Sequence, residues 1–232
     1  MNSINSNLAD RDLRQRLIVP PEKLAVCHAI VIGVGAIGRQ VAIQLAAVGI
    51  PALDLFDDDI VSAENLAPQA YFADDLGQKK VEATAALVSR LNPAMSCRPF
   101  AERFKRSSGR VLDEIIAGSF KPVVFCCVDS ITARQLVWET VLRRAAFFTD
   151  GRMSAEIIRI VTATRPAADY HYVTTLFPES QTQGGSCTAK STVYTGSIAA
   201  GLMLGQFTQW LRDLPGEKDL SLNLLSAELT CQ

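Results

Sequence analysis

The chain has 232 residues, of which 48% are hydrophobic and 20% charged, and its 23 Lys and Arg against 24 Asp and Glu give a formal net charge of −1. This composition excludes disordered and low-complexity proteins, and the charge gives no electrostatic reason to bind nucleic acid or an anionic membrane. No apolar run reaches the roughly 18 residues that span a bilayer, and the polar N-terminus lacks the apolar centre of a secretory signal. We therefore expect a cytoplasmic protein without membrane association or a nucleic-acid partner.

Strands and helices are predicted to alternate over residues 25–150. Short apolar runs predict strands at 25–32, 52–56, 95–101, 122–128 and 146–149. Apolar residues at helical spacing predict helices at 37–48, 78–90, 108–117 and 131–144, and a polar loop is expected before the second of them. This alternation predicts an α/β fold, with a Rossmann-like, mainly parallel sheet covered by helices on both faces.

The pattern changes after residue 150. Strands are expected at 156–164, 170–175 and 221–229, and a long helix at 192–211. We therefore predict a single nucleotide-binding domain over 25–232, with a core at 25–150 and a small C-terminal extension at 151–232. Residues 1–24 are predicted to form an N-terminal arm.

Three glycines, Gly33, Gly35 and Gly38, lie between the first predicted strand and the first predicted helix. The first glycine allows a tight turn, the second lets a phosphate approach the backbone, and the third lets helix and strand pack closely. An acidic residue about 20 positions later should bind ribose hydroxyls, and Asp57 ends the second predicted strand. The pattern predicts a nucleotide site, although it does not separate NAD from FAD, S-adenosylmethionine or ATP.

Further polar residues follow Asp57 in a fixed order. They occur in the segments Asp57-Asp58-Asp59-Ile60-Val61, Glu64-Asn65-Leu66-Ala67-Pro68-Gln69, Gly77-Gln78-Lys79-Lys80 and Asp129 to Arg134. With the three glycines, this order resembles the motifs of the ThiF/MoeB adenylyltransferases, prokaryotic relatives of ubiquitin-activating enzymes. The resemblance runs from about Arg14 to Arg152, well over half of the chain.

The resemblance implies an enzyme that uses ATP and Mg²⁺ to adenylate the C-terminal carboxylate of a small ubiquitin-like or sulfur-carrier protein. Such chemistry joins two anions, so it requires countercharge on the phosphates, whereas the carboxylate is already a nucleophile and requires no catalytic histidine. The implied ATP-site residues are Gly33, Gly35, Gly38, Asp57, Asp59, Asn65, Gln69 and Lys80. Asp129 is implied to bind Mg²⁺, and Arg14 to insert into the ATP site of the partner subunit of a homodimer.

Two positions need separate treatment. Pro68 stands where the family has an arginine that contacts phosphate, so either Lys79, Arg152 or Arg14 compensates, or activity is reduced or lost.

Cys187, near the predicted long helix and Lys190, resembles the catalytic cysteine of autophagy-type activating enzymes and would accept the carboxyl group as a thioester. An unreactive loop cysteine, or one packed at the start of the helix, remains the alternative.

Two other classes of function stay open. An NAD(P)-dependent oxidoreductase would account for the glycines and Asp57 but not for Asn65, Lys80 and Asp129 together. A non-catalytic relative, acting as a nucleotide-binding or scaffold protein, would account for Pro68. A related enzyme that acts on a small peptide or a tRNA base is a further variant, although the near-neutral charge disfavours tRNA.

Overall fold

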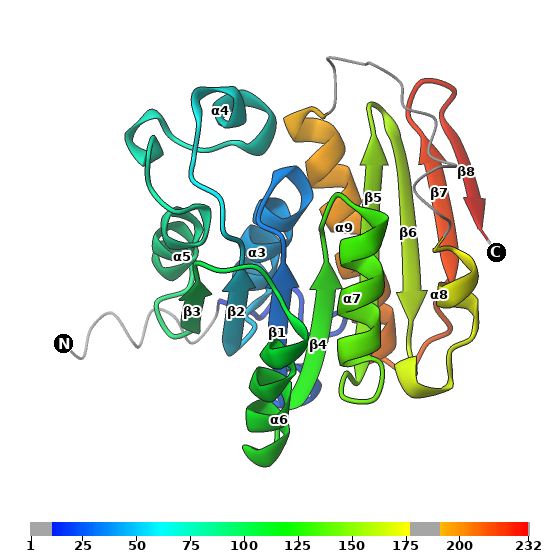
Figure 1. Ribbon diagram of the computed structural model, residues 1–232. Coiled ribbons are helices and arrows are strands. Elements are labelled where there is room, and N and C mark those ends of the chain that lie inside the picture. The colour runs from blue at the N-terminus through cyan, green and yellow to red at the C-terminus, as the bar shows by residue number, and fades with distance from the viewer. Residues whose placement is uncertain (1–10, 177–190, 232) are drawn as a thin grey trace.

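The computed structural model describes residues 11–176 and 191–231, and within them a single sheet lies between two layers of helices (Figure 1). The sheet has eight strands in the order β3-β2-β1-β4-β5-β6-β7-β8. Their bounds are β1 Cys27–Ile32, β2 Ala52–Phe56, β3 Ser96–Phe100, β4 Lys121–Cys126, β5 Phe147–Ser154, β6 Ile157–Ala163, β7 Asp219–Asn223 and β8 Glu228–Cys231. The expected Rossmann-like α/β fold is confirmed.

The strand directions divide the sheet into two parts. Strands β1 to β5 run parallel, whereas β6, β7 and β8 are each antiparallel to the preceding strand. Strand β5 continues to Ser154, beyond its expected end at 149, and its later residues pair with β6. The C-terminal strands therefore extend the same sheet that begins in the nucleotide-binding half.

Helices cover both faces of the sheet because alternate strand residues point to opposite sides. Val31 packs in a core with residues of α3, α5 and α9, whereas its neighbour Ile30 packs with residues of α6, α7 and α8. Figure 1 shows α3 and α9 behind the sheet and α6, α7 and α8 in front. The helices are α2 Pro21–Leu24, α3 Ala36–Val48, α4 Ala63–Gln69, α5 Lys80–Leu91, α6 Gly109–Ala117, α7 Ile131–Val141, α8 His171–Thr174 and α9 Val193–Leu211.

The segment expected as a polar loop contains the helix α4. Ser62 and Asn65 form a capping box at its N-terminus, in which Asn65 Oδ1 accepts a hydrogen bond from Ser62 N at 3.1 Å. Pro68 lies inside this helix, near its end. In the sequence, the spacing of Ser62 and Asn65 indicates a helix start, whereas Pro68 argues against a helix in this segment.

Two expectations for the C-terminal half were wrong. Residues 170–175 form α8 and not a strand, and Asp169 Oδ1 accepts the Tyr172 N–H at 2.9 Å, which favours a helical turn. The single strand expected at 221–229 is the hairpin β7-β8. Asn223 Oδ1 accepts the Leu225 N–H at 3.0 Å and so turns the chain back. In the described part of the chain, no helix is long and apolar enough to cross a bilayer.

Asp54 of β2 has a buried carboxylate that forms an ion pair with Arg98, its neighbour on β3. Its two oxygens accept from Arg98 Nε at 2.7 Å and Nη2 at 2.6 Å, and His28 Nε2 lies 3.1 Å away. Burial alone would raise the pKa of Asp54, but its contacts with His28 and Arg98 outweigh this and lower the pKa. The ionised carboxylate is therefore favoured in the folded state.

We expect Asp54→Asn to lower the free energy of unfolding by about 1.5 kcal/mol at neutral pH, because a charged hydrogen-bonded pair is lost but the half-exposed Arg98 can be solvated. A carboxyl whose folded pKa is lowered stabilises above its unfolded pKa of about 3.9, and this stabilisation is lost as the pH falls through the folded pKa. The difference between wild type and variant in urea unfolding should therefore shrink below about pH 4. A difference that stays constant at every pH would exclude this ion pair as its source.

Candidate functional site

The glycine turn between β1 and α3 has the geometry that the sequence predicts. Gly33 has φ +86°, and a Cβ there would lie 2.7 Å from Cys127 O. A Cβ on Gly38 would lie 1.8 Å from Gly33 O, whereas a Cβ on Gly35 would meet nothing within 4 Å. The open space beside Gly35 lies at the N-terminus of α3, where backbone N–H groups attract phosphate. The turn therefore fits a nucleotide phosphate.

Asp57, at the end of β2, is hydrogen-bonded to this turn. Its Oδ2 accepts the Val34 N–H at 2.7 Å, and its Oδ1 accepts the Asp59 N–H at 2.9 Å. Burial raises the pKa of Asp57, although these backbone hydrogen bonds oppose the shift. The carboxylate is thus fixed beside the glycine turn, at the position where a ribose-binding acid is required.

Lys80 is the first residue of α5, and only 5% of its surface is exposed. Its Nζ lies 2.8 Å from Asp59 Oδ2, and its backbone N–H donates to Asp59 O at 3.1 Å. The neighbouring Lys79 Nζ instead donates to Asp58 O at 2.8 Å. Lys80 is therefore a buried cation next to Asp57 and Asp59, and not part of a solvated helix face.

Asn65 and Gln69 both lie on α4, above the upper edge of the sheet in Figure 1. The Asn65 side chain is used by the capping box with Ser62. Gln69 Oε1 is buried and has no hydrogen-bond partner among the described residues. Gln206 Oε1 and Gln209 Oε1 on α9 are unpartnered in the same way, so this feature alone does not assign Gln69 to a ligand.

Asp129 follows β4 at the same edge of the sheet as Gly33 and Asp57, because the carboxyl ends of parallel strands meet there. Ser130, and not Asp129, caps α7 by accepting the Ala133 N–H at 3.2 Å. The exposed Asp129 carboxylate makes no hydrogen bond or ion pair with the described residues. It is an oxygen donor of the kind that Mg²⁺ prefers.

Asp57, Asp58 and Asp59 form a second group of carboxylates, with oxygens within 4.8 Å of one another. Two of them are already paired, Asp58 with Arg103 Nε at 2.9 Å and Asp59 with Lys80 at 2.8 Å. Asp129 is therefore the better candidate for a metal ligand in this part of the structure.

A buried ionic network beneath Asp129 was not anticipated from the sequence. Asp150 is fully buried and accepts from Arg134 Nε at 3.0 Å, Arg152 Nε at 2.7 Å and the Tyr172 hydroxyl at 3.0 Å. Arg134 Nη1 also donates to Asp129 O at 3.1 Å, so the network positions the Asp129 backbone. The feature of the sequence that could have indicated this network is Asp150, an aspartate directly after the apolar run 146–149.

Arg152 is fully engaged by this network. Besides Asp150, its guanidinium donates to Thr175 O at 2.9 Å and to Thr175 Oγ1 at 2.8 Å. Lys79 is likewise held by Asp58 O. Arg152 is therefore committed to this network and is not placed to replace the arginine absent at Pro68.

Arg14 lies at the opposite end of α3 from the glycine turn. The neighbouring Arg11 donates to Ala46 O at 2.6 Å, and Gln15 Nε2 donates to Val48 O at 2.9 Å. Because α3 has 13 residues, about 20 Å separate its two ends. The exposed Arg14 is thus not brought to the glycine turn of its own chain.

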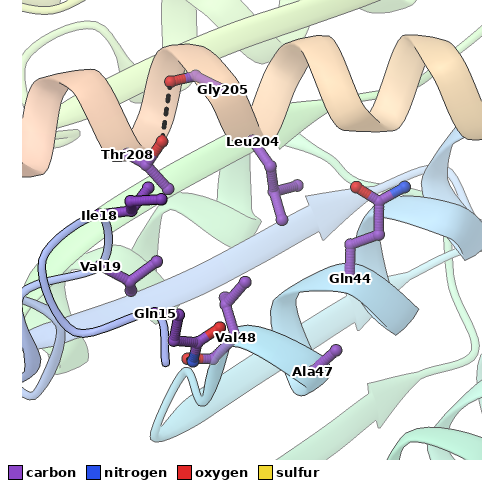
Figure 2. Close-up of a pocket in the computed structure, with 9 residues that line it drawn as sticks. All are labelled: Gln15, Ile18, Val19, Gln44, Ala47, Val48, Leu204, Gly205 and Thr208. Atoms are coloured by element: carbon purple, nitrogen blue, oxygen red, sulfur yellow. Dashed lines mark hydrogen bonds between the residues drawn. The ribbon is translucent and has the colours of Figure 1, made fainter. Parts of the chain in front are cut away.

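A groove with a volume of about 390 Å³ lies beside this N-terminal segment, between α3 and α9 (Figure 2). Its lining residues are Gln15, Ile18, Val19, Gln44, Ala47, Val48, Leu204, Gly205 and Thr208. They include none of the charged side chains that could bind a nucleotide, so the groove is separate from the candidate site.

Cys187 lies outside the described residues, so the structure does not place its thiol. The helix that follows it in the chain, α9, starts at Val193. A Cβ on Gly196 would lie 2.5 Å from Ala36 O, so the first turn of α9 packs against the first turn of α3. The N-terminus of α9 therefore lies next to the glycine turn.

Comparison with known proteins gives a family and, among others, the two curated relatives described next. The model of the ThiF family matches residues 10–230. The SAMP-activating enzyme E1 of Haloferax volcanii is 35% identical over 141 residues, which are 58% of this chain and 50% of that protein. The sulfur carrier protein ThiS adenylyltransferase of Escherichia coli is 30% identical over 115 residues, 49% of this chain and 44% of that protein. The chain therefore spans half or less of the length of these relatives.

Solved structures share the fold at lower sequence identity. The structure of PaaA has a TM-score of 0.76 and 19% identity, and the match covers 100% of this chain and 84% of that one. The structure of E. coli MccB with ATP has a TM-score of 0.71 and 17% identity, and the match covers 97% of this chain and 70% of that one. At these identities the likeness concerns the fold.

Proposed function

Because the chain belongs to the ThiF family, we propose that it uses ATP and Mg²⁺ to adenylate the C-terminal carboxylate of a small ubiquitin-like or sulfur-carrier protein. The supporting observation is that Asp57, Lys80 and Asp129 gather with the glycine turn at one edge of the sheet. The relatives named for activating SAMP and adenylylating ThiS favour this class of substrate over an oxidoreductase reaction.

The proposed reaction transfers adenylate to a carboxylate. A carboxylate oxygen forms a bond to the α-phosphorus of ATP, the bond from that phosphorus to the bridging oxygen breaks, and pyrophosphate leaves. The N–H groups of the glycine turn and the ammonium of Lys80 stabilise negative charge on the phosphates. Asp129 would hold Mg²⁺, which would supply additional countercharge to the phosphates when bound. No general base is required, because the nucleophile is already ionised.

The fate of the adenylate forms the second part of the proposal. The Cys187 thiolate, or an external thiol, attacks the acyl carbon, and AMP leaves with the bonding electrons. The helix that follows Cys187 in the chain, α9, starts beside α3 and the glycine turn, which supports testing this thiol as the acceptor.

The function is tested by carrier-dependent exchange of labelled pyrophosphate into ATP, with purified ThiS-type or SAMP-type carriers as probes. We expect exchange that requires Mg²⁺ and is lost when the carrier's C-terminal carboxylate is amidated. Carrier binding without exchange would contradict an enzymatic role and support the scaffold alternative.

We further propose a homodimer in which Arg14 of one subunit reaches the partner subunit's ATP site, since Arg14 is remote from its own. Arg14→Ala and Lys80→Met should each be inactive alone. Mixing them after subunit exchange should restore about a quarter of the wild-type exchange rate, because half of the dimers are hybrid and each hybrid has one intact site. A mixture that stays inactive would show that Arg14 does not act in trans.

A further inference from the structure

Arg39 is a buried cation one residue beyond the third glycine of the turn. Its surface is 0% exposed, and its Nη1 donates to Thr84 Oγ1 at 3.1 Å. Its Nε and Nη2 have no hydrogen-bond partner among the described residues, and Asp75 Oδ2 lies 3.7 Å from Nη2. Burial lowers the pKa of Arg39 despite the opposing effects of Tyr71 and Asp75. The free protein therefore contains an incompletely paired internal charge, which is unfavourable.

Tyr71 connects this cation to the glycine turn. The Arg39 guanidinium carbon lies 3.9 Å from the centroid of the Tyr71 ring. The Tyr71 hydroxyl donates to Val34 O at 2.7 Å, and Val34 N donates to Asp57 Oδ2 at 2.7 Å. One aromatic ring thus separates the charge of Arg39 from the backbone of the turn.

The other cations near the site are paired with other groups. Lys80 contacts Asp59, Lys79 donates to Asp58 O, and position 68 carries a proline and hence no charge. Arg39 differs in that it is fully buried while its Nε and Nη2 lack a hydrogen-bond partner among the described residues and its ion pair with Asp75 is as long as 3.7 Å. A polyanion over the glycine turn would offset its incompletely paired charge across Tyr71.

We propose that Arg39 is a positioning residue for the nucleotide phosphates, acting through Tyr71 on the glycine turn and supplying the positive potential that Pro68 cannot. This inference rests on the proposed ATP site. Arg39 does not touch the nucleotide. It holds Tyr71 by stacking, Tyr71 fixes the Val34 carbonyl, and the charge favours a triphosphate over an uncharged ligand.

The test compares Arg39→Met with Arg90→Met, a matched substitution of an exposed arginine on α5. Arg39→Met should bind ATP about tenfold more weakly in calorimetry and leave adenosine binding unchanged, since adenosine carries no phosphate. Its Tm without nucleotide is measured alongside to establish that the variant folds, since Thr84 and Asp75 each lose a partner. Arg90→Met should match the wild type in each measurement.

Tyr71→Phe tests the connection between Arg39 and the glycine turn. It also provides an independent test of the inference if Arg39→Met does not fold. It should also weaken ATP binding, and the double variant should lose less than the two single losses combined. Wild-type ATP affinity in Arg39→Met, or in Tyr71→Phe, overturns the inference. Equal losses for ATP and adenosine also overturn it, because they indicate general damage. A wild type that binds no ATP overturns the proposed function as well.

Discussion

Replacing Gly38 by alanine should abolish nucleotide binding and lower the free energy of unfolding by about 3 kcal/mol. The added Cβ would lie 1.8 Å from Gly33 O, which is a backbone atom and not the end of a flexible side chain. Gly33 cannot easily shift to relieve this contact. Its backbone has φ +86°, and it already lies so close to Cys127 O that a Cβ on Gly33 would be 2.7 Å from that oxygen. Helix α3 must therefore separate from the turn, and urea unfolding together with ATP calorimetry would record both losses.

Gly35→Ala is the matched control for that substitution. Nothing lies within 4 Å of a Cβ at this position, so the folded protein should lose about 1 kcal/mol or less. The same Cβ would occupy the space in which a phosphate approaches the helix N-terminus, so ATP binding should still be weakened strongly. Unchanged ATP affinity in Gly35→Ala would place the nucleotide elsewhere.

Lys80→Met should reduce carrier-dependent pyrophosphate exchange by about 10³-fold, the scale expected for removing one preorganised charge from a transition state. Stability should change by less than about 1 kcal/mol, because the partner Asp59 has a side chain that is 60% exposed and can be solvated. A loss of rate with retained stability is therefore expected from unfolding and exchange measurements on the same preparation.

Lys79→Met provides the comparison for this prediction. Lys79 and Lys80 are adjacent, yet Lys79 Nζ donates to Asp58 O whereas Lys80 Nζ is buried against Asp59. Lys79→Met should therefore keep most of the exchange rate. Equal losses in the two variants would show that the burial and orientation of Lys80 do not matter for the reaction.

The parts of the fold that could be predicted depend on short-range constraints. The strand β1 is an apolar run, and the glycine turn after it requires residues that lack a Cβ, so both are visible in the sequence. The position of Asp57 could also be predicted, because the residue after a strand of this fold lies at the edge of the sheet beside the glycine turn.

The parts that could not be predicted depend on contacts between distant residues. The local hydrogen bond from Tyr172 N to Asp169 could have indicated α8, but nothing local shows that the Tyr172 hydroxyl donates to Asp150, a residue 22 positions earlier. Arg39 looks like an ordinary helix residue until the chain brings Tyr71 and Thr84 against it. Likewise, the resemblance selects Lys80 from two adjacent lysines, but only the fold shows that Lys80 is buried more deeply than Lys79.

The central claim, that the glycine turn belongs to an ATP site, is tested most directly by calorimetry of ATP with Mg²⁺ against NAD⁺. The wild type should bind ATP with Mg²⁺ and not NAD⁺, and Asp129→Ala and Lys80→Ala should both weaken that binding. Binding of NAD⁺ without ATP would contradict the account and favour a dehydrogenase, and binding of neither nucleotide would contradict it in favour of a scaffold.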